Sequence, residues 1–226
     1  MRFNRVQSFF YFMLASLFSL FSCSSTTNGS GSVDLGLSVK WGSCNLGANR
    51  PEQFGNYFAW GEIETKDFYN WSNYKWAHKY DKLTKYCPNS FCWDGDGQMD
   101  NKVSLDPDDD AVKSILGKNW RMPTLEEWLE LSDSCIWQAY TLNGVKGTKV
   151  TSNVEGFKGN WIFFPAAGFI FNSEYQDQGE RGVYWIPSLY TRDPSYARCY
   201  EIIGDFGYYI NPDRAAGLTI RPVVEK

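Results

Sequence analysis

Residues 120–128 read Trp-Arg-Met-Pro-Thr-Leu-Glu-Glu-Trp, and this stretch contains the clearest helix start in the chain. Thr124 and Glu127 stand three residues apart, which is the spacing of a capping box, in which each side chain accepts a hydrogen bond from the other residue's backbone N–H. Leu125, Trp128 and further apolar residues follow at helical spacing. The stretch therefore predicts an amphipathic helix whose apolar face packs against a core.

A second helix start is predicted at Asp106. Aspartate is a favourable N-cap residue, and Pro107 suits the first helical position because its missing N–H has no intrahelical acceptor there. Asp108 and Asp109 then place negative charge at the positive end of the helix dipole. We therefore interpret this acidic run as part of a helix start.

The rest of the chain is typical of short strands separated by turns. Apolar and aromatic segments are bounded by Gly, Pro, Asn or Asp. We expect strands or hairpins in segments 33–41, 57–62, 161–165, 182–185, 198–202 and 218–223. No helical period persists between residues 63 and 110, so long loops are expected there. The predicted fold class is α+β, with antiparallel sheets, one or two helices and long loops.

The N-terminus has the features of a bacterial lipoprotein signal peptide. Arg2 and Arg5 precede an apolar stretch over residues 9–21, which is too short for the roughly 20 residues that a membrane-spanning helix needs. The stretch ends at Cys23 in the sequence Leu-Phe-Ser-Cys. This sequence resembles the lipobox, at which lipoproteins are acylated and cleaved. The alternative is an ordinary signal peptide followed by an unmodified cysteine.

These signals divide the chain into a signal peptide (1–22), a flexible Ser/Gly/Thr tether (23–32) and one domain (33–226). We expect the mature chain to be held by a lipid on Cys23, and to contact the membrane through that lipid only. The expected localisation is the bacterial cell envelope, on the periplasmic or the surface face of the outer membrane.

The composition excludes several function classes. The formal net charge is −4 and Lys and Arg form no cluster, so nucleic acid is not an expected partner. A single histidine, His78, cannot build a histidine-rich metal site. Besides Cys23, five cysteines would lie in an oxidising compartment, so disulfides and free thiols both remain open. Cys87 and Cys92 have the spacing of a short disulfide loop.

Six segments resemble, in order, motifs of the Fibrobacter succinogenes major paralogous domain, which is abundant in lipoproteins of Bacteroides and related bacteria. They are VDLGLSVKW (33–41), YFAWGE (57–62), WRMPT (120–124), FPAAG (164–168), GVYW (182–185) and IRPV (220–223). The RMPTxxEW element and the closing Arg-Pro also look like the formylglycine-generating-enzyme branch of the C-type lectin fold. The resemblance implies a C-type-lectin-like fold for almost the whole mature chain. It implies little about the ligand, because fold does not fix function.

The related enzymes provide a test of catalysis. Formylglycine-generating enzymes hold copper with two cysteines near the C-terminus, and this chain has only Cys199 in that region. Related iron-dependent enzymes use a histidine cluster, which one histidine cannot supply. No pair of carboxylates stands out as acid and base. We therefore expect no catalytic residue and interpret Cys199 as a small buried strand residue. An enzyme of unknown chemistry on the same fold is the alternative.

Residues 94–101 place carboxylates among glycines and are the one candidate for a cofactor, calcium. Calcium needs several oxygen ligands on a tightly turning loop, and Asp94, Asp96 and Asp100 have suitable spacing. The segment is not an EF-hand, because Met99 stands at the turn glycine and Leu105 at the bidentate glutamate. The alternative is a solvated acidic turn.

The segment from Tyr190 to Arg214 combines Tyr and Arg with Asp and Asn in turn-rich sequence. Aromatic side chains bind sugar rings and also anchor protein partners. In lectin-fold relatives built as variable binding proteins, the corresponding late segment forms the ligand-facing surface. The predicted ligand-binding residues are Tyr190, Arg192, Tyr196, Tyr208, Tyr209 and Asn211. The alternative is that these residues pack an aromatic-rich core.

The sequence thus predicts a non-catalytic, lipid-anchored binding or surface-interaction domain with a carbohydrate or protein ligand. The alternatives are the enzyme named above and a structural component of the envelope or of fimbriae.

Overall fold

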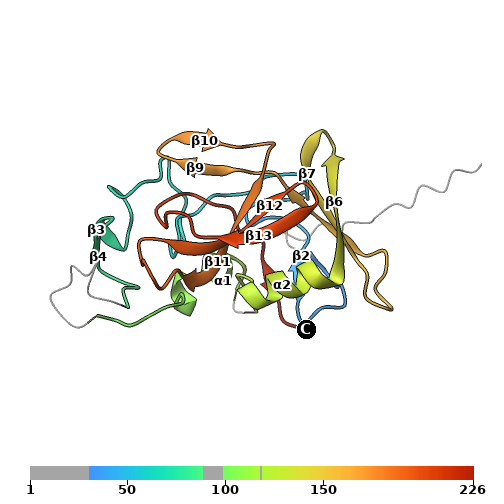
Figure 1. The fold of residues 1–226 in the computed structure, drawn as a ribbon, viewed down its shortest axis with the longest axis horizontal. Coiled ribbons are helices and arrows are strands. Elements are labelled where there is room, and N and C mark those ends of the chain that lie inside the picture. Colours follow the sequence, from blue (N-terminus) through green and yellow to red (C-terminus); the bar gives the residue numbers. More distant parts are fainter. Residues whose placement is uncertain (1–30, 89–98, 118) are drawn as a thin grey trace, which may run out of the picture.

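The computed structural model describes residues 31–88, 99–117 and 119–226, and this part of the chain has an α+β fold (Figure 1). The helical elements are η1 (Pro107–Asp109), α1 (Ala111–Leu116) and α2 (Leu125–Ser134). The strands are β1 (Ser32–Val33), β2 (Lys40–Gly42), β3 (Ala77–Lys79), β4 (Lys82–Leu83), β5 (Trp120–Arg121), β6 (Cys135–Leu142), β7 (Val145–Ser152), β8 (Trp161–Pro165), β9 (Phe169–Phe171), β10 (Glu174–Gln176), β11 (Gly182–Leu189), β12 (Ala197–Ile203), β13 (Phe206–Ile210) and β14 (Val223–Val224). No helix in these described ranges is long and apolar enough to cross a membrane.

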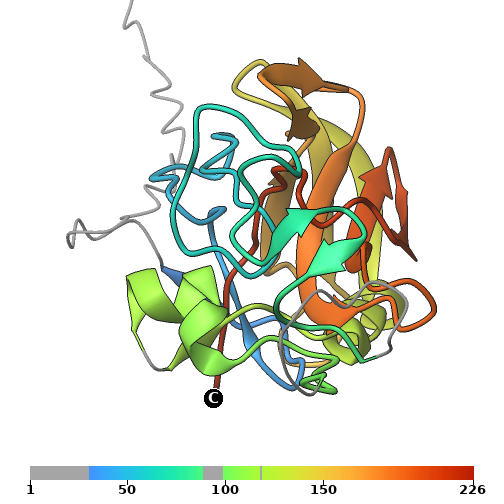
Figure 2. The same ribbon diagram turned by 90° about the vertical axis from the view of Figure 1, so that its left-hand side faces the viewer.

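The described strands pair in an antiparallel manner. A four-stranded sheet has the order β1-β2-β14-β5, and two three-stranded sheets have the orders β6-β7-β8 and β11-β12-β13. β9 with β10 and β3 with β4 form two-stranded hairpins, the latter at the end of the molecule that faces the viewer in Figure 2. β14 lies between β2 and β5, so that Val223 is paired with both Trp41 and Arg121. The expected α+β class with antiparallel sheets is confirmed.

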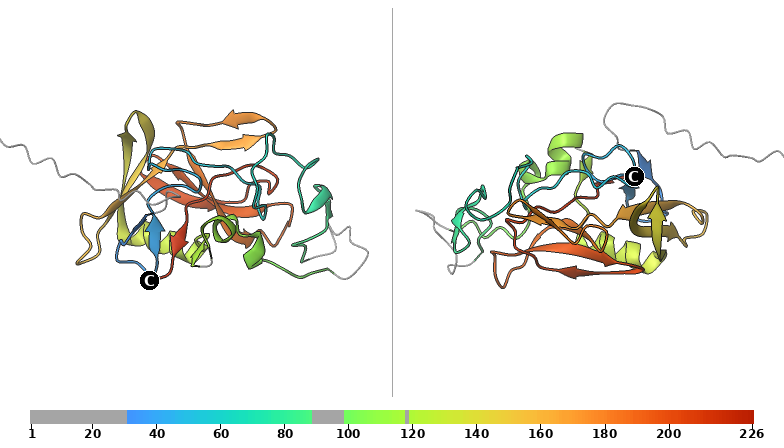
Figure 3. Two further views of the ribbon diagram at one scale, coloured as in Figure 1. Left: turned by 180° about the vertical axis from the view of Figure 1, so that it is seen from behind. Right: turned by 90° about the horizontal axis from the view of Figure 1, so that it is seen from above.

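The sheet β11-β12-β13 lies between two hydrophobic cores. Val183, Trp185 and Cys199 belong to one core, whereas Tyr184 and Tyr200 belong to the other. Successive residues of a strand point to opposite faces, so β11 and β12 are buried on both sides. β13 is the edge strand of this sheet, and the view from above in Figure 3 places it at the outer side of the molecule.

Helix α2 begins as predicted. Thr124 Oγ1 accepts a hydrogen bond from Glu127 N at 3.3 Å, and Glu127 Oε2 accepts one from Thr124 N at 2.8 Å. On the apolar face, the ring of the fully buried Trp128 stacks on Tyr200 with the centroids 4.6 Å apart and 6° between the planes. The capping box and the packed apolar face are therefore both confirmed.

The other predicted helix start is wrong by four residues. Helix α1 begins at Ala111, and its cap is Asp110, whose carboxylate accepts a hydrogen bond from Val112 N at 2.9 Å. Asp106 makes no capping hydrogen bond and precedes only the 3-10 turn Pro107–Asp109. The extended backbone of Asp110, with ψ at 107°, separates this turn from the helix.

Two predicted strands are more irregular than expected. Segment 218–223 contributes only part of β14, and segment 57–62 contributes no strand. Instead, Phe58 and Leu218 exchange two backbone hydrogen bonds, at 2.9 and 3.0 Å, in an isolated bridge within the core. Such bridges satisfy buried backbone groups without a regular sheet.

Candidate functional site

The β12–β13 hairpin forms an exposed edge of the central sheet. Its two-residue turn is made possible by Gly204, whose φ is +64°. The pairing between the two arms of the hairpin keeps the same register from this turn to the bridge between Tyr196 and Asp213. Because side chains alternate along a strand, Tyr208 and Tyr209 lie on opposite faces of β13. Tyr209 is paired with Tyr200, which contacts α2, so we name its side the α2 face and the side of Tyr208 the ridge face.

Phe206 and Tyr208 form a flat aromatic surface on the ridge face. Their ring centroids are 5.9 Å apart with 17° between the planes, and the two residues are 54% and 41% exposed. The Tyr208 hydroxyl donates a hydrogen bond to Glu201 Oε1 at 3.1 Å. Partial burial and this hydrogen bond raise the pKa of Tyr208. The bond to the neighbouring strand fixes the ring before any ligand binds.

Arg181 links Glu201 to a second carboxylate. Its Nη1 donates to both oxygens of Glu201 at 3.1 Å, and its Nε and Nη2 donate to Oδ2 of Asp177 at 2.9 and 2.5 Å. Burial opposes the charged form, but the two carboxylates raise the pKa of Arg181. The guanidinium lies 5.3 Å from the ring centroid of Phe169. We name the set the hairpin ridge: Phe169, Asp177, Arg181, Glu201, Phe206 and Tyr208.

The other predicted ligand-binding residues lie apart from the ridge. Tyr209 is on the α2 face, where the Arg198 guanidinium lies 5.8 Å from its ring centroid. Asn211 is two residues further along the chain, so strand alternation assigns it to the same face. The loop at the far end of the ladder carries Tyr190, Arg192 and Tyr196. The structure therefore brings only Tyr208 of the six to the ridge.

The predicted binding surface does not extend to Arg214, which is a correction. Arg214 is fully buried, and its guanidinium donates to the backbone carbonyls of Tyr86 and Pro194 at 3.0 Å and of Lys85 at 2.8 Å. It also lies 5.1 Å from the ring centroid of Tyr74. Arg214 therefore belongs to the core.

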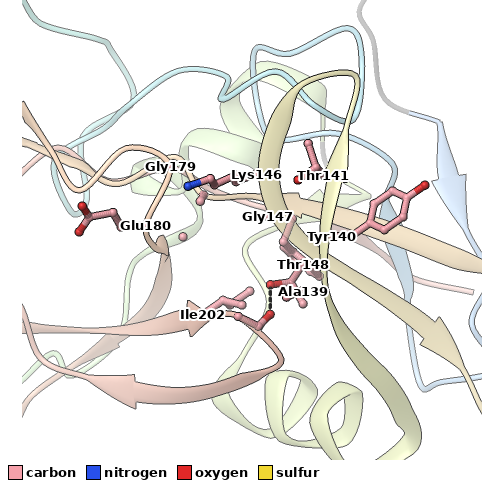
Figure 4. A pocket seen from close by; sticks show the side chains of 13 residues that line it. Ala139, Tyr140, Thr141, Lys146, Gly147, Thr148, Gly179, Glu180 and Ile202 are labelled. Carbon is pink, nitrogen blue, oxygen red and sulfur yellow. Dashed lines mark hydrogen bonds between the residues drawn. The ribbon is translucent and has the colours of Figure 1, made fainter.

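A cavity of about 370 Å³ opens at the turn of the same hairpin. Thr148 Oγ1 donates to the carbonyl of Gly204 at 2.7 Å, which ties β7 to the turn (Figure 4). In this view Lys146 and Glu180 extend on one side of the β6–β7 hairpin and Tyr140 on the other. Glu180 and Gly182, the two neighbours of Arg181 in the chain, line the cavity together with Ile202, whose side chain packs in the core on the α2 side of the sheet.

The lipidation and calcium residues are mostly outside the described residues, where Cys23, Asp94 and Asp96 lie. Asp100 is described, and its two oxygens accept backbone hydrogen bonds from Tyr86 N at 2.6 Å and Cys87 N at 3.0 Å. Within the described ranges, no group of three or more His, Cys, Asp or Glu residues is placed to hold a metal ion. Calcium binding stays a prediction.

The thiols of Cys135 and Cys199 are poor nucleophiles. Cys199 is fully buried in β12, as predicted, and burial raises the pKa of its thiol well above the usual range. Burial also raises the pKa of Cys135 to about 11. A thiol reacts as its thiolate, which is scarce at these pKa values. Cys92 lies outside the described residues, so its pairing with Cys87 stays a prediction.

Comparison with protein-family models, curated proteins and solved structures finds no match for this chain. The ridge is therefore defined by its geometry. Sequence reasoning missed Phe206, although strand alternation would have placed it beside Tyr208. It also missed Arg181 and Glu201, because no local pattern pairs two residues that are 20 positions apart.

Proposed function

We propose that this chain is a lipid-anchored, non-catalytic binding domain of the C-type-lectin-like fold, and that its hairpin ridge binds carbohydrate. The α+β architecture, the six ordered motifs and the lipobox-like N-terminus support this proposal. The observation that carries the ligand class is the stacked pair Phe206 and Tyr208 beside the Arg181–Glu201 ion pair.

Carbohydrate fits this arrangement for physical reasons. A sugar ring presents an apolar C–H face, which packs on a flat exposed aromatic surface, and hydroxyls at its edge, which need donors and acceptors. Phe206 and Tyr208 supply the surface, and Glu201, which accepts hydrogen bonds from both Tyr208 and Arg181, joins it to the polar groups of Arg181 and Asp177. Because Tyr208 and Arg181 are already held by hydrogen bonds, little conformational entropy is lost when a ligand binds.

A protein ligand is a second candidate, favoured by the edge of β13. In a hairpin with a two-residue turn, Gly207 and Tyr209 turn their backbone N–H and C=O groups away from β12. No other strand in the described part of the chain pairs with this edge. An extended peptide could add there as a further strand.

The carbohydrate proposal is tested with a glycan array probed by the full-length chain purified in detergent. Phe206→Ala and Tyr208→Ala should each weaken binding at least about tenfold, because aromatic anchors dominate such interfaces. Tyr209→Ala is the matched control, since this exposed tyrosine lies on the opposite face of the same strand and should leave glycan binding unchanged. Equal losses in all three variants, or no loss in any, would contradict the assignment.

The anchor is tested separately with Cys23→Ser. This variant should incorporate no labelled fatty acid and should leave the membrane fraction, because the acyl chains hold the mature protein there. Continued acylation would contradict the lipobox assignment.

A further inference from the structure

We infer that Arg181 is the fixed cation of the carbohydrate site, so that binding at the ridge needs no divalent metal ion and favours neutral over acidic sugars. This inference rests on the proposed function and specifies how the site recognises its ligand.

The first argument is the position of Arg181 between two carboxylates. Asp177 and Glu201 both lie within 3.1 Å of its guanidinium nitrogens. Two carboxylates that converge on one point repel each other unless a cation lies between them. Arg181 is that cation, and the Glu201 side chain, at 2% exposure, depends on it because a buried charge must be paired. The ridge therefore keeps its geometry without a metal ion.

The second argument is the set of polar atoms that stays available. Arginine has five N–H donors, and Arg181 makes four hydrogen bonds to Glu201 and Asp177 within the described part of the chain, so at least one donor is left for a ligand. Oδ1 of Asp177 accepts no hydrogen bond from the described residues, and the oxygen of Tyr208 can still accept one. A donor and two acceptors beside an aromatic surface match the hydroxyl groups of a neutral sugar.

The third argument is charge. One guanidinium faces two carboxylates, so the ion-pair cluster has a net charge of about −1 at neutral pH. Glu180 and Asp205, both exposed, flank Arg181 and Phe206 in the chain and add further negative charge. Uronic or sulfated sugars would bring like charges to this surface, and repulsion between exposed charges acts over about 10 Å at moderate salt. Neutral polysaccharides avoid this cost.

The experiment measures retention of the full-length chain on immobilised polysaccharides in two buffers, one with excess chelator and one with millimolar calcium. Mannan and laminarin are the neutral probes, alginate and polygalacturonate the acidic probes, and chitosan the cationic probe. We expect retention on a neutral probe, equal in both buffers, and at least about tenfold weaker retention on the acidic probes.

Two variants test Arg181 itself. Arg181→Lys keeps the positive charge but loses the planar fork, so retention on the neutral probe should fall at least about tenfold while the melting temperature changes little. Glu201→Gln removes one negative charge and should reduce the discrimination against the acidic probes, which a merely structural role of the ion pair would not do. Arg198→Lys, on the α2 face, is the matched control and should behave as the wild type.

The outcomes separate the two proposals. Absence of retention on every probe would overturn both the proposed function and this inference. Neutral retention that depends on Phe206 but disappears in chelator, or that is unchanged in a folded Arg181→Lys variant, would overturn the inference alone. Equal retention on acidic probes, or retention on chitosan only, would also overturn it.

Discussion

Arg214 and Arg221 are wholly buried, whereas the Arg181 side chain is 30% exposed, and the three guanidinium groups have different partners. Arg214 donates only to backbone carbonyls, and Arg221 donates to the carbonyls of Gly42 and Phe163 at 2.9 and 2.7 Å. Arg181 donates only to carboxylates.

The difference separates two uses of one residue type. The carbonyl partners of Arg214 lie in loops, whereas those of Arg221 lie in β2 and β8, which belong to different sheets. Each guanidinium therefore joins segments that no single sheet connects. Burial lowers the pKa of Arg221, which shows the desolvation cost of this arrangement. Arg181 instead joins carboxylates at the surface, beside exposed aromatic rings. A buried arginine on carbonyls thus organises the core, and a half-exposed arginine on carboxylates can face a ligand.

The largest expected effect is that of Arg214→Met. Methionine fills part of the volume but leaves several buried carbonyls without donors, and each costs about 1–3 kcal/mol. We expect a loss of at least about 3 kcal/mol in the free energy of unfolding, which lowers the melting temperature by roughly 6–12 °C in a chain of this size. Thermal unfolding followed by circular dichroism measures the shift. Arg192→Met, at an exposed loop position, is the control. Equal stability of the two variants would contradict the claim that buried Arg214 organises the core.

A smaller effect is expected for Arg181→Met. The substitution leaves Glu201 buried without its cation, at a cost of up to about 3 kcal/mol in the free energy of unfolding, because breaking a buried ion pair costs roughly 3–5 kcal/mol and Arg181 is partly exposed. Adding Glu201→Gln removes the unpaired charge, so the double variant should recover most of the lost stability. Urea unfolding of the wild type, both single variants and the double variant measures this coupling. If the losses in the free energy of unfolding of the two single variants simply add in the double variant, the Arg181–Glu201 ion pair does not account for the destabilisation.

The smallest expected effect concerns Asp106, which is partly exposed and pairs with Lys102 and Lys85. Hydrogen bonds from Lys102 and Lys85 lower the pKa of Asp106 below the ordinary value of 3.8. Its ionised form therefore stabilises the folded state above pH 3.8, and this contribution is lost as the pH falls through the lowered pKa. Because Asp106 is partly exposed, the contribution should be below about 1 kcal/mol.

Asp106→Asn measures this contribution in melts at a series of pH values. The difference from the wild type should be present at pH 6 and should shrink as the pH falls below 3.8. A difference that stays constant with pH would show that packing, rather than charge, explains the substitution.

The parts of the fold that have local signals could be predicted from the sequence. Thr124 and Glu127 mark the start of α2 within four residues. The strand segments that were predicted correctly are short apolar and aromatic segments bounded by turn residues. The turn at Asn143 and Gly144, where φ is +50° and +85°, is a further local signal that would have located the β6–β7 hairpin. The sequence does not locate the cap of α1, because Asp106 and Asp110 are equally good cap residues and tertiary contacts select between them.

The site could be predicted only in part. Tyr208 is among the predicted ligand-binding residues because the segment around it is rich in aromatic residues, and its role in binding stays a prediction. Composition alone cannot separate Tyr208 from Tyr209, since only the strand register assigns them to opposite faces. Arg214 looked like a surface residue, and its burial depends on carbonyls from loops whose paths the sequence does not specify.

The edge position of β13 has a consequence for how such a domain can diversify. β11 is packed on both faces, so substitutions there are constrained by volume and by two cores at once. Phe206, Tyr208 and Tyr209 are 41–54% exposed, so exchanging them alters surface chemistry at little cost in stability. A gene that duplicates can therefore change the surface chemistry of this hairpin, one residue at a time, without losing the framework that holds it.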